Sequence, residues 1–203
     1  MKKIGLALVL VALWIAPSLA ETYSSPLGFS VNLPPNWKVV NAQKMRSNPQ
    51  LLNTAFAEAQ KESLQDADHD MMADLKTRVQ QGEIEYFYNP GQAGSLIAVM
   101  QRVGQIPETG RQLIQACDSL PNDMVRMFGK SLRVYACDLR PLGNRVALYI
   151  VTDGVAPGTK SMQYELQKTP DQILIFTANA RDGNFHAVSS EFDQIMNHVT
   201  LQQ

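Results

Sequence analysis

Hydrophobic and polar positions follow their clearest pattern in the last third of the chain. Residues 145–152 are almost continuously apolar, which is typical of a strand covered on both faces. Residues 161–167 alternate, which predicts a strand with one buried and one solvated face. The polar positions of that strand are Gln163, Glu165 and Gln167. Residues 172–178 are apolar again and follow a turn that contains Pro170, so the sequence predicts an antiparallel hairpin here.

An amphipathic helix is predicted directly after these strands, over residues 185–199. Its apolar residues recur at steps of three and four and form one stripe. They are Phe185, Val188, Phe192, Ile195, Met196 and Val199. Because this stripe has to cover a sheet, the pattern predicts an α+β fold in which helices pack on an antiparallel β-sheet.

The earlier part of the chain supplies further strands and two helical regions. Alternating or apolar runs predict strands at residues 29–33, 37–40, 83–88, 95–103 and 131–139. A helical pattern extends from about residue 49 to 81, and Gly82 is suited to end it. A second helix is predicted from about Thr109, with an interruption at Pro121 because proline lacks the amide donor of a helix interior. Its expected inward-facing residues are Leu113, Ile114, Cys117 and Leu120.

Cys117 and Cys137 are the only two cysteines of the chain. An even number of cysteines in an oxidising compartment favours a disulfide. This bond would join the second helix to the following strand and close a loop of about 20 residues, worth about 3 kcal/mol in the chain-entropy estimate. Two buried free thiols are the alternative, because a sequence does not supply the Cα separation that a disulfide requires. The chain has no Cys-x-x-Cys motif that would indicate a catalytic thiol.

The first 20 residues have the pattern of a secretory signal peptide. Lys2 and Lys3 precede an apolar run over residues 4–16, and small residues near the end of the segment predict cleavage after Ala20. The apolar run is short for a membrane span, so we expect no stable span after cleavage; an uncleaved anchor is the alternative. Glu21, not cysteine, follows the cleavage site, so a lipoprotein is not predicted. The mature protein is expected to be periplasmic or secreted.

Cleavage would leave one predicted domain, residues 21–203, which is long enough for a hydrophobic core. Loss of the two N-terminal lysines leaves 16 basic and 19 acidic residues, a net charge of −3. The sequence contains no basic block or stripe, which argues against a nucleic acid as the partner.

Both ends of the predicted domain resemble one fold family. Residues 28–34 read Gly-Phe-Ser-Val-Asn-Leu-Pro and are followed by Trp37, which resembles the opening strand–turn–strand of the PsbP/Mog1-like fold. The apolar strand at 172–178 and a C-terminal helix that carries Phe192 and Ile195 are similar to the ending of that family. The resemblance implies an α/β/α sandwich with a six- or seven-stranded antiparallel sheet. It also implies a binding or accessory protein, since the family shares no catalytic residues.

Asp66, His69 and Asp70 form the candidate metal site of the sequence. Positions i, i+3 and i+4 share one helix face, so two carboxylates and an imidazole could converge on one cation. A solvated acidic helix face is the alternative, and a helix that began at Asp68 would separate the three side chains. Methionine pairs such as Met71 and Met72 could bind Cu(I), but methionine at helical spacing also fills cores.

No catalytic or cofactor-binding motif is evident in the sequence. It lacks Gly-x-Ser-x-Gly, His-Glu-x-x-His and a phosphate-binding glycine loop, and no cofactor is predicted. The imidazole bases are His69, His186 and His198. A Ser–His–Asp set assembled in space needs no sequence motif, so it stays open as a route to a hydrolase.

The sequence therefore predicts a secreted or periplasmic, non-catalytic accessory or binding protein of the bacterial cell envelope. Its partner would be another envelope protein or a small ligand. Two surfaces are candidates for the contact: the polar strand face with Gln163, Glu165 and Gln167, and the turn-rich loop 89–94. The alternatives are a periplasmic protein that handles divalent metal through Asp66, His69 and Asp70, and a hydrolase with a spatially assembled site.

Overall fold

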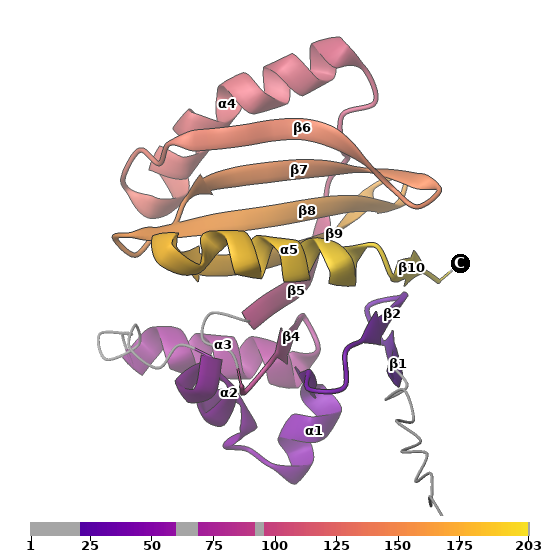
Figure 1. The fold of residues 1–203 in the computed structure, drawn as a ribbon, viewed down its shortest axis with the longest axis vertical. Helices are drawn as coiled ribbons and strands as arrows, with labels where there is room; N and C mark the ends of the chain where they lie inside the picture. Colours follow the sequence, from indigo (N-terminus) through magenta and orange to yellow (C-terminus); the bar gives the residue numbers. More distant parts are fainter. Residues whose placement is uncertain (1–20, 60–68, 92–95, 203) are drawn as a thin grey trace, which may run out of the picture.

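The structure is a computed structural model and describes residues 21–59, 69–91 and 96–202 (Figure 1). The predicted signal peptide lies outside the described residues. The main sheet has seven strands, and every strand is antiparallel to its neighbours. Their order is β3 (Lys38–Val40), β4 (Ile84–Tyr88), β5 (Leu96–Val103), β9 (Gln172–Arg181), β8 (Thr159–Thr169), β7 (Arg145–Asp153) and β6 (Val134–Leu142).

A second, smaller sheet joins the two ends of the described chain. Its strands are β1 (Glu21–Ser25), β2 (Phe29–Leu33) and β10 (Val199–Leu201), with β2 in the middle. The sequence predicted β2 but neither β1 nor β10 as a strand. Phe29 of β2 is fully buried and its ring contacts that of Phe176 on β9 edge to face, with centroids 5.1 Å apart. The small sheet therefore packs on the main sheet through its middle strand.

One face of the main sheet, called the α5 face here, is covered by helix α5 (Phe185–Met196) and the small sheet (Figure 1). The short 3-10 helix η1 (Asp182–Asn184) leads into α5. As the sequence predicted, the apolar stripe of α5 is buried; it contributes Val188, Phe192, Ile195 and Met196 to the larger core cluster. The hydroxyl of Tyr164 on β8 donates to Asp193 of α5 over 2.9 Å, which adds a polar link between helix and sheet.

The opposite face, called the α4 face, is covered at its two ends by different helices. Helices α1 (Ala42–Ser47), α2 (Leu51–Ala59) and α3 (His69–Gln81) lie over β3, β4 and β5, where Phe56 packs against Tyr86. Helix α4 (Gly110–Phe128) lies at the β6 and β7 end (Figure 1). The predicted α+β fold, with a sheet of six or seven antiparallel strands between helical layers, is thus confirmed.

Helix α4 differs from the prediction in two respects. It continues through Pro121, where an interruption was expected. A capping box between Thr109 and Gln112 begins the helix and Gly129, with φ of +69°, ends it, so the loss of one interior amide donor does not break it. Ile114 was expected to face inward and is 63% exposed. No residue of α4 is fully buried, so this helix packs loosely on the sheet.

Candidate functional site

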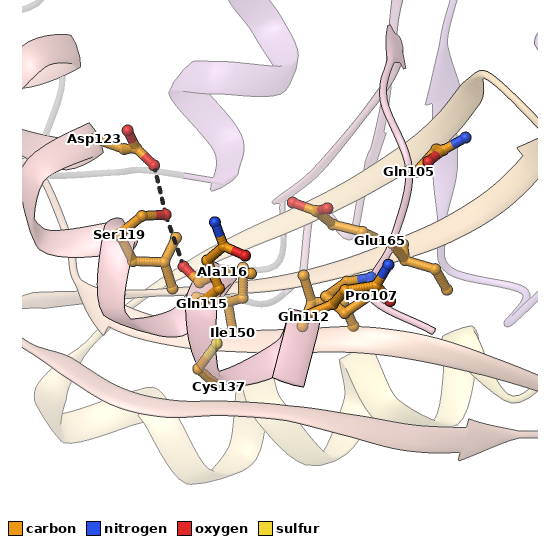
Figure 2. Close-up of a pocket in the computed structure, with 13 residues that line it drawn as sticks. Gln105, Pro107, Gln112, Gln115, Ala116, Ser119, Asp123, Cys137, Ile150 and Glu165 are labelled. Carbon is orange, nitrogen blue, oxygen red and sulfur yellow. Dashed lines mark hydrogen bonds between the residues drawn. The ribbon is translucent and has the colours of Figure 1, made fainter. Parts of the chain in front are cut away.

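A groove of about 470 Å³ separates α4 from the α4 face of the sheet (Figure 2). Its floor consists of Cys137 on β6, Leu148 and Ile150 on β7, and Glu165 on β8. Helix α4 forms one wall with Gln112, Gln115, Ala116, Ser119, Leu120 and Asp123. The segment between β5 and α4 forms the rim with Gln105, Ile106 and Pro107. These residues define what is called the α4 groove below.

The strand register explains why the floor residues lie together. Leu148 is paired directly with Glu165, and Cys137 with Ile150. Directly opposite residues of antiparallel strands project from the same face, so all four side chains point toward α4. Leu148 and Ile150 are buried, whereas Glu165 is only half-buried, which leaves an apolar floor with one carboxylate.

The rim of the groove is fixed by Gln167, which lies two residues after Glu165 on β8. Its side-chain oxygen accepts from the backbone amide of Ile106 over 2.8 Å, and its amide nitrogen donates to the Gly104 carbonyl over 3.3 Å. Gln105 adds a hydrogen bond from its side-chain amide to the Pro170 carbonyl, 2.7 Å long. Gln167 was a candidate contact residue of the sequence, but the structure uses its side chain to hold the rim.

The charge at the floor of the groove is that of Glu165. Its Oε1 accepts from the side-chain amide of Gln163 over 2.5 Å. Burial raises the pKa of Glu165, and the Gln163 hydrogen bond and the positive charge of Arg102 on β5 oppose this rise. The structure therefore places Glu165 facing the groove (Figure 2), and the Gln163 side chain donates a hydrogen bond to its carboxylate.

A second carboxylate, that of Asp123, lies on the α4 wall. The hydroxyl of Ser119 donates to its Oδ2 over 3.1 Å, and the Arg126 guanidinium donates to its Oδ1 over 2.5 Å. Ser119 also approaches the Ala116 carbonyl, 2.9 Å away, within its own helix. The Asp123 charge is thus already compensated by a neighbouring cation.

The predicted disulfide between Cys117 and Cys137 is present and joins α4 to β6, with 5.8 Å between the two Cα atoms. Cys137 is part of the groove floor. No residue of α4 is fully buried, so this link adds a covalent constraint to the contacts that the half-buried side of the helix makes with the sheet. The disulfide therefore helps to set the width of the α4 groove.

The other residues singled out by the sequence do not join this site. His186 and His198 are exposed and do not line the α4 groove. In loop 89–94 the Asn89 side chain accepts from the Gly91 amide over 3.0 Å, and residues 92–95 lie outside the described part of the chain. No helix among the described residues is long and apolar enough to cross a membrane.

The predicted metal site falls at the edge of what the structure describes. Asp66 lies outside the described residues, and His69 and Asp70 begin α3 without described side chains. Among the described residues, no three histidine, cysteine, aspartate or glutamate side chains form a cluster that could hold a metal. The site of Asp66, His69 and Asp70 therefore stays a prediction from the sequence.

If that prediction is right, the mature protein should bind one divalent cation, because three ligands on one helix face can converge on it. Equilibrium dialysis with Zn²⁺, Cu²⁺ and Mn²⁺ measures the stoichiometry. Replacing His69 and Asp70 by alanine together should abolish uptake, whereas replacing the exposed His186 should leave it unchanged. Equal uptake by all three proteins, or none by the wild type, would rule the site out.

The wall of the groove was not predicted from the sequence, although the sequence contains a signal for it. Gln112, Gln115, Ser119 and Asp123 follow one another at steps of three, four and four and so form a polar stripe on one side of the helix. Such a stripe normally faces solvent. Here it faces the groove, because Cys117 turns the neighbouring side of α4 toward β6.

Comparison with known proteins yields a likeness in structure alone. No protein-family model matches the chain, and no curated protein matches it in sequence. It is similar to cyanobacterial PsbP (CyanoP) from Synechocystis sp. PCC 6803, with a TM-score of 0.54 and 9% identity over 93% of this chain and 95% of that chain.

Two further solved structures are similar at lower scores. One is a protein from Bacteroides thetaiotaomicron VPI-5482, with a TM-score of 0.49 and 12% identity; the match covers 91% of this chain but only 49% of that one. The other is the immunity protein TplEi of the T6SS from Pseudomonas aeruginosa, complexed with "L" peptide, with a TM-score of 0.47 and 10% identity over 91% of this chain and 99% of that chain. Element order, sheet topology and the likeness to CyanoP agree with the resemblance found in the sequence: the chain has a PsbP-like fold.

Proposed function

We propose that this chain is a non-catalytic binding protein of the bacterial cell envelope, and that the α4 groove holds its ligand. The observation that carries the proposal is the groove itself. Its volume of about 470 Å³ falls within the range of about 300–1,000 Å³ that is common for small-molecule sites. An apolar floor beside a wall with polar side chains is also the usual composition of such sites.

The Cys117–Cys137 disulfide supports a location outside the cytoplasm, since reducing conditions in the cytosol rarely allow structural disulfides to persist. The signal-peptide pattern of residues 1–20 supports the same location. Together they favour a protein that acts in the periplasm or outside the cell.

The chemistry of the lining supports binding and not catalysis. Among the described lining residues, Ser119 is the one hydroxyl, and it is hydrogen-bonded within α4 to Ala116 and Asp123. Cys137 is oxidised in the disulfide, so it offers no thiolate. The described histidines His186 and His198 lie elsewhere, and the carboxylate within hydrogen-bond reach of Ser119, that of Asp123, is paired with Arg126, which weakens it as a base for a nucleophile.

A large side chain that fills the α4 groove should prevent the ligand from binding. Ala116 is a small, half-buried lining residue on α4, and Ile114 is an exposed residue on the outer side of the same helix. We expect Ala116→Trp to abolish ligand retention because the indole occupies the space above Leu148, whereas Ile114→Trp should retain the ligand. Native mass spectrometry of the proteins taken gently from a bacterial periplasm measures the added mass.

Both variants introduce tryptophan into α4, one in the groove and one on the exposed outer side, so retention of the ligand by Ile114→Trp excludes a general effect of a tryptophan on this helix. Preparation under oxidising conditions keeps the Cys117–Cys137 bond in both. An added mass that persists at wild-type occupancy in Ala116→Trp would place the ligand elsewhere and contradict the proposed site.

A further inference from the structure

The charges of the α4 groove are of one sign. Among the described residues that line it, two are acidic, Glu165 and Asp123, and none is lysine, arginine or histidine. Asp123 lies on the wall and is paired with Arg126. The floor carboxylate of Glu165 therefore dominates the electrostatic character of the deeper part of the groove.

Glu165 has no close cationic partner among the residues that the structure describes. No salt bridge within 4.0 Å of its carboxylate occurs among the described residues, and Arg102 acts on it only at longer range. Oε1 accepts from Gln163, and Oε2 has no hydrogen-bond donor among the residues that the structure describes. A carboxylate that is partly removed from water gains most from a hydrogen-bonded cation, because its own desolvation is otherwise uncompensated.

The surroundings of Glu165 fit a cation carried on an apolar chain. Its direct cross-strand partner on the floor is Leu148, and Ile150 lies further along β7. Ile106 on the rim and Leu120 on α4 line the same space. Methylene groups can pack on such side chains while the charged end reaches the carboxylate, as lysine and arginine stems do on protein surfaces.

We propose that the α4 groove selects ligands that carry a primary amine or guanidinium at the end of a short apolar chain, and that Glu165 binds this charge. The inference rests on the proposed binding function and adds the ligand class. A free alkylamine and a lysine or arginine side chain of a partner segment share this chemistry. The side-chain amide of Gln115 on the α4 wall would contact the backbone of such a segment.

The test is a titration of the ¹⁵N-labelled mature protein, followed by the NMR shifts of the backbone amides. Pentylamine and pentan-1-ol are the matched probes, because they differ in charge and hardly in size. The variants are Glu165→Gln and, as a control, Glu83→Gln, which removes the same charge from an exposed ion pair with Arg78. Glu165→Asp retains the charge and serves as the conservative variant.

Pentylamine should shift the amides of the groove residues and bind at least about tenfold more tightly than pentan-1-ol, as expected for a charge-assisted hydrogen bond. Glu165→Gln should remove this difference, Glu83→Gln should keep it, and Glu165→Asp should keep part of it. The spectra also report folding, so a misfolded variant is recognised directly.

Equal binding of pentylamine and pentan-1-ol would overturn the inference about charge and leave the proposed binding function standing. The absence of shifts with either probe would also overturn it, and the Ala116→Trp experiment then decides the proposed function separately. A second pair of probes distinguishes the sources of the cation: acetyl-Ala-Lys-Ala-amide and its norleucine analogue. Tighter binding of the lysine peptide than of pentylamine indicates a partner segment, and the reverse order indicates a free amine.

Discussion

Replacing Cys117 and Cys137 by serine together is expected to lower the free energy of unfolding by about 3 kcal/mol, the chain-entropy value for a loop of this length. The sequence separation of the two cysteines is 20 residues. This loss of stability should affect some parts of the molecule more than others. Helix α4 has no fully buried residue, whereas the strands β7, β8 and β9 contribute many residues to the core. We therefore expect α4 to open locally before the sheet unfolds.

Urea unfolding of the wild type and the double variant measures the change in stability, and amide hydrogen exchange locates it. Exchange should increase over residues 110–128 and change little in β9. Wild-type protein reduced with dithiothreitol is the control, since it loses the same bond without a mutation. Unchanged protection of α4 in both proteins would show that noncovalent contacts hold the helix, and the disulfide would then not set the groove width.

Loss of the bond should also abolish pentylamine binding, because the wall of the groove moves while the floor stays in place. Glu165 remains on β8 in the reduced protein, so a retained affinity would mean that the floor alone binds the amine. Exchange and binding thus test two separate consequences of one covalent link.

The strands of the main sheet could be predicted because their burial is visible in the sequence itself. β8 has one face in the core and one facing α4, and its residues alternate accordingly: Tyr164 and Leu166 are buried, and Glu165 between them is half-buried. β7 is covered on both faces, and its buried run from Ala147 to Thr152 is continuous. Local pattern and tertiary environment agree in these strands, so the last third of the chain indicated the fold class.

The small sheet could not be predicted in the same way. β1 begins with the exposed residues Glu21 and Thr22 and carries no apolar alternation. β1 is a strand because it pairs with β2 in an antiparallel ladder, in which Ser25 lies opposite Phe29. On its other side β2 pairs with β10, which comes from the opposite end of the chain. Such pairings follow from the tertiary arrangement and leave no local pattern.

The groove was predictable only in part, for a related reason. The alternation of polar and apolar residues along β8 indicated that Glu165 lies on a polar face of the strand. It did not indicate that helix α4 would lie opposite this face. Cys117 lies on the side of α4 that faces β6, where its disulfide to Cys137 joins the helix to the sheet, and this pairing is not fixed by the local pattern of the helix. The apolar pattern of α4 predicted that Ile114 faces the interior, and this prediction was wrong because Ile114 is exposed.

Glu85 is the second position where we expect a large effect. It is 1% exposed on β4 and links the main sheet to β1 of the small sheet. The hydroxyls of Tyr23 and Ser25 donate to its two carboxylate oxygens over 2.9 and 2.7 Å, and Asn41 donates to the Tyr23 oxygen. Glu85→Ala leaves these buried donors unpaired and opens a cavity, so we expect a loss of about 3 kcal/mol in unfolding free energy.

Glu85→Gln should have the opposite effect at neutral pH. Burial raises the pKa of Glu85 in the folded protein, and the hydrogen bonds from Ser25 and Tyr23 only partly oppose this. The folded state therefore binds more protons than the unfolded state between the ordinary and the raised pKa. Stability from this group is complete below the ordinary pKa and is lost as the pH rises through the raised value.

A neutral glutamine keeps an acceptor for the Tyr23 hydroxyl, and its amide nitrogen donates to the Ser25 oxygen in place of accepting from it, without this pH-dependent cost. We therefore expect Glu85→Gln to be more stable than the wild type at pH 8 and to lose the decline in stability above pH 4.5 that Glu85 causes. Urea unfolding between pH 4 and 8 measures both, with Glu83→Gln in its exposed ion pair as the control. If the pH dependence of Glu85→Gln matched that of the wild type, the Tyr23 and Ser25 hydrogen bonds would compensate the buried charge fully, and β1 would be held to the main sheet by an ionised carboxylate at neutral pH.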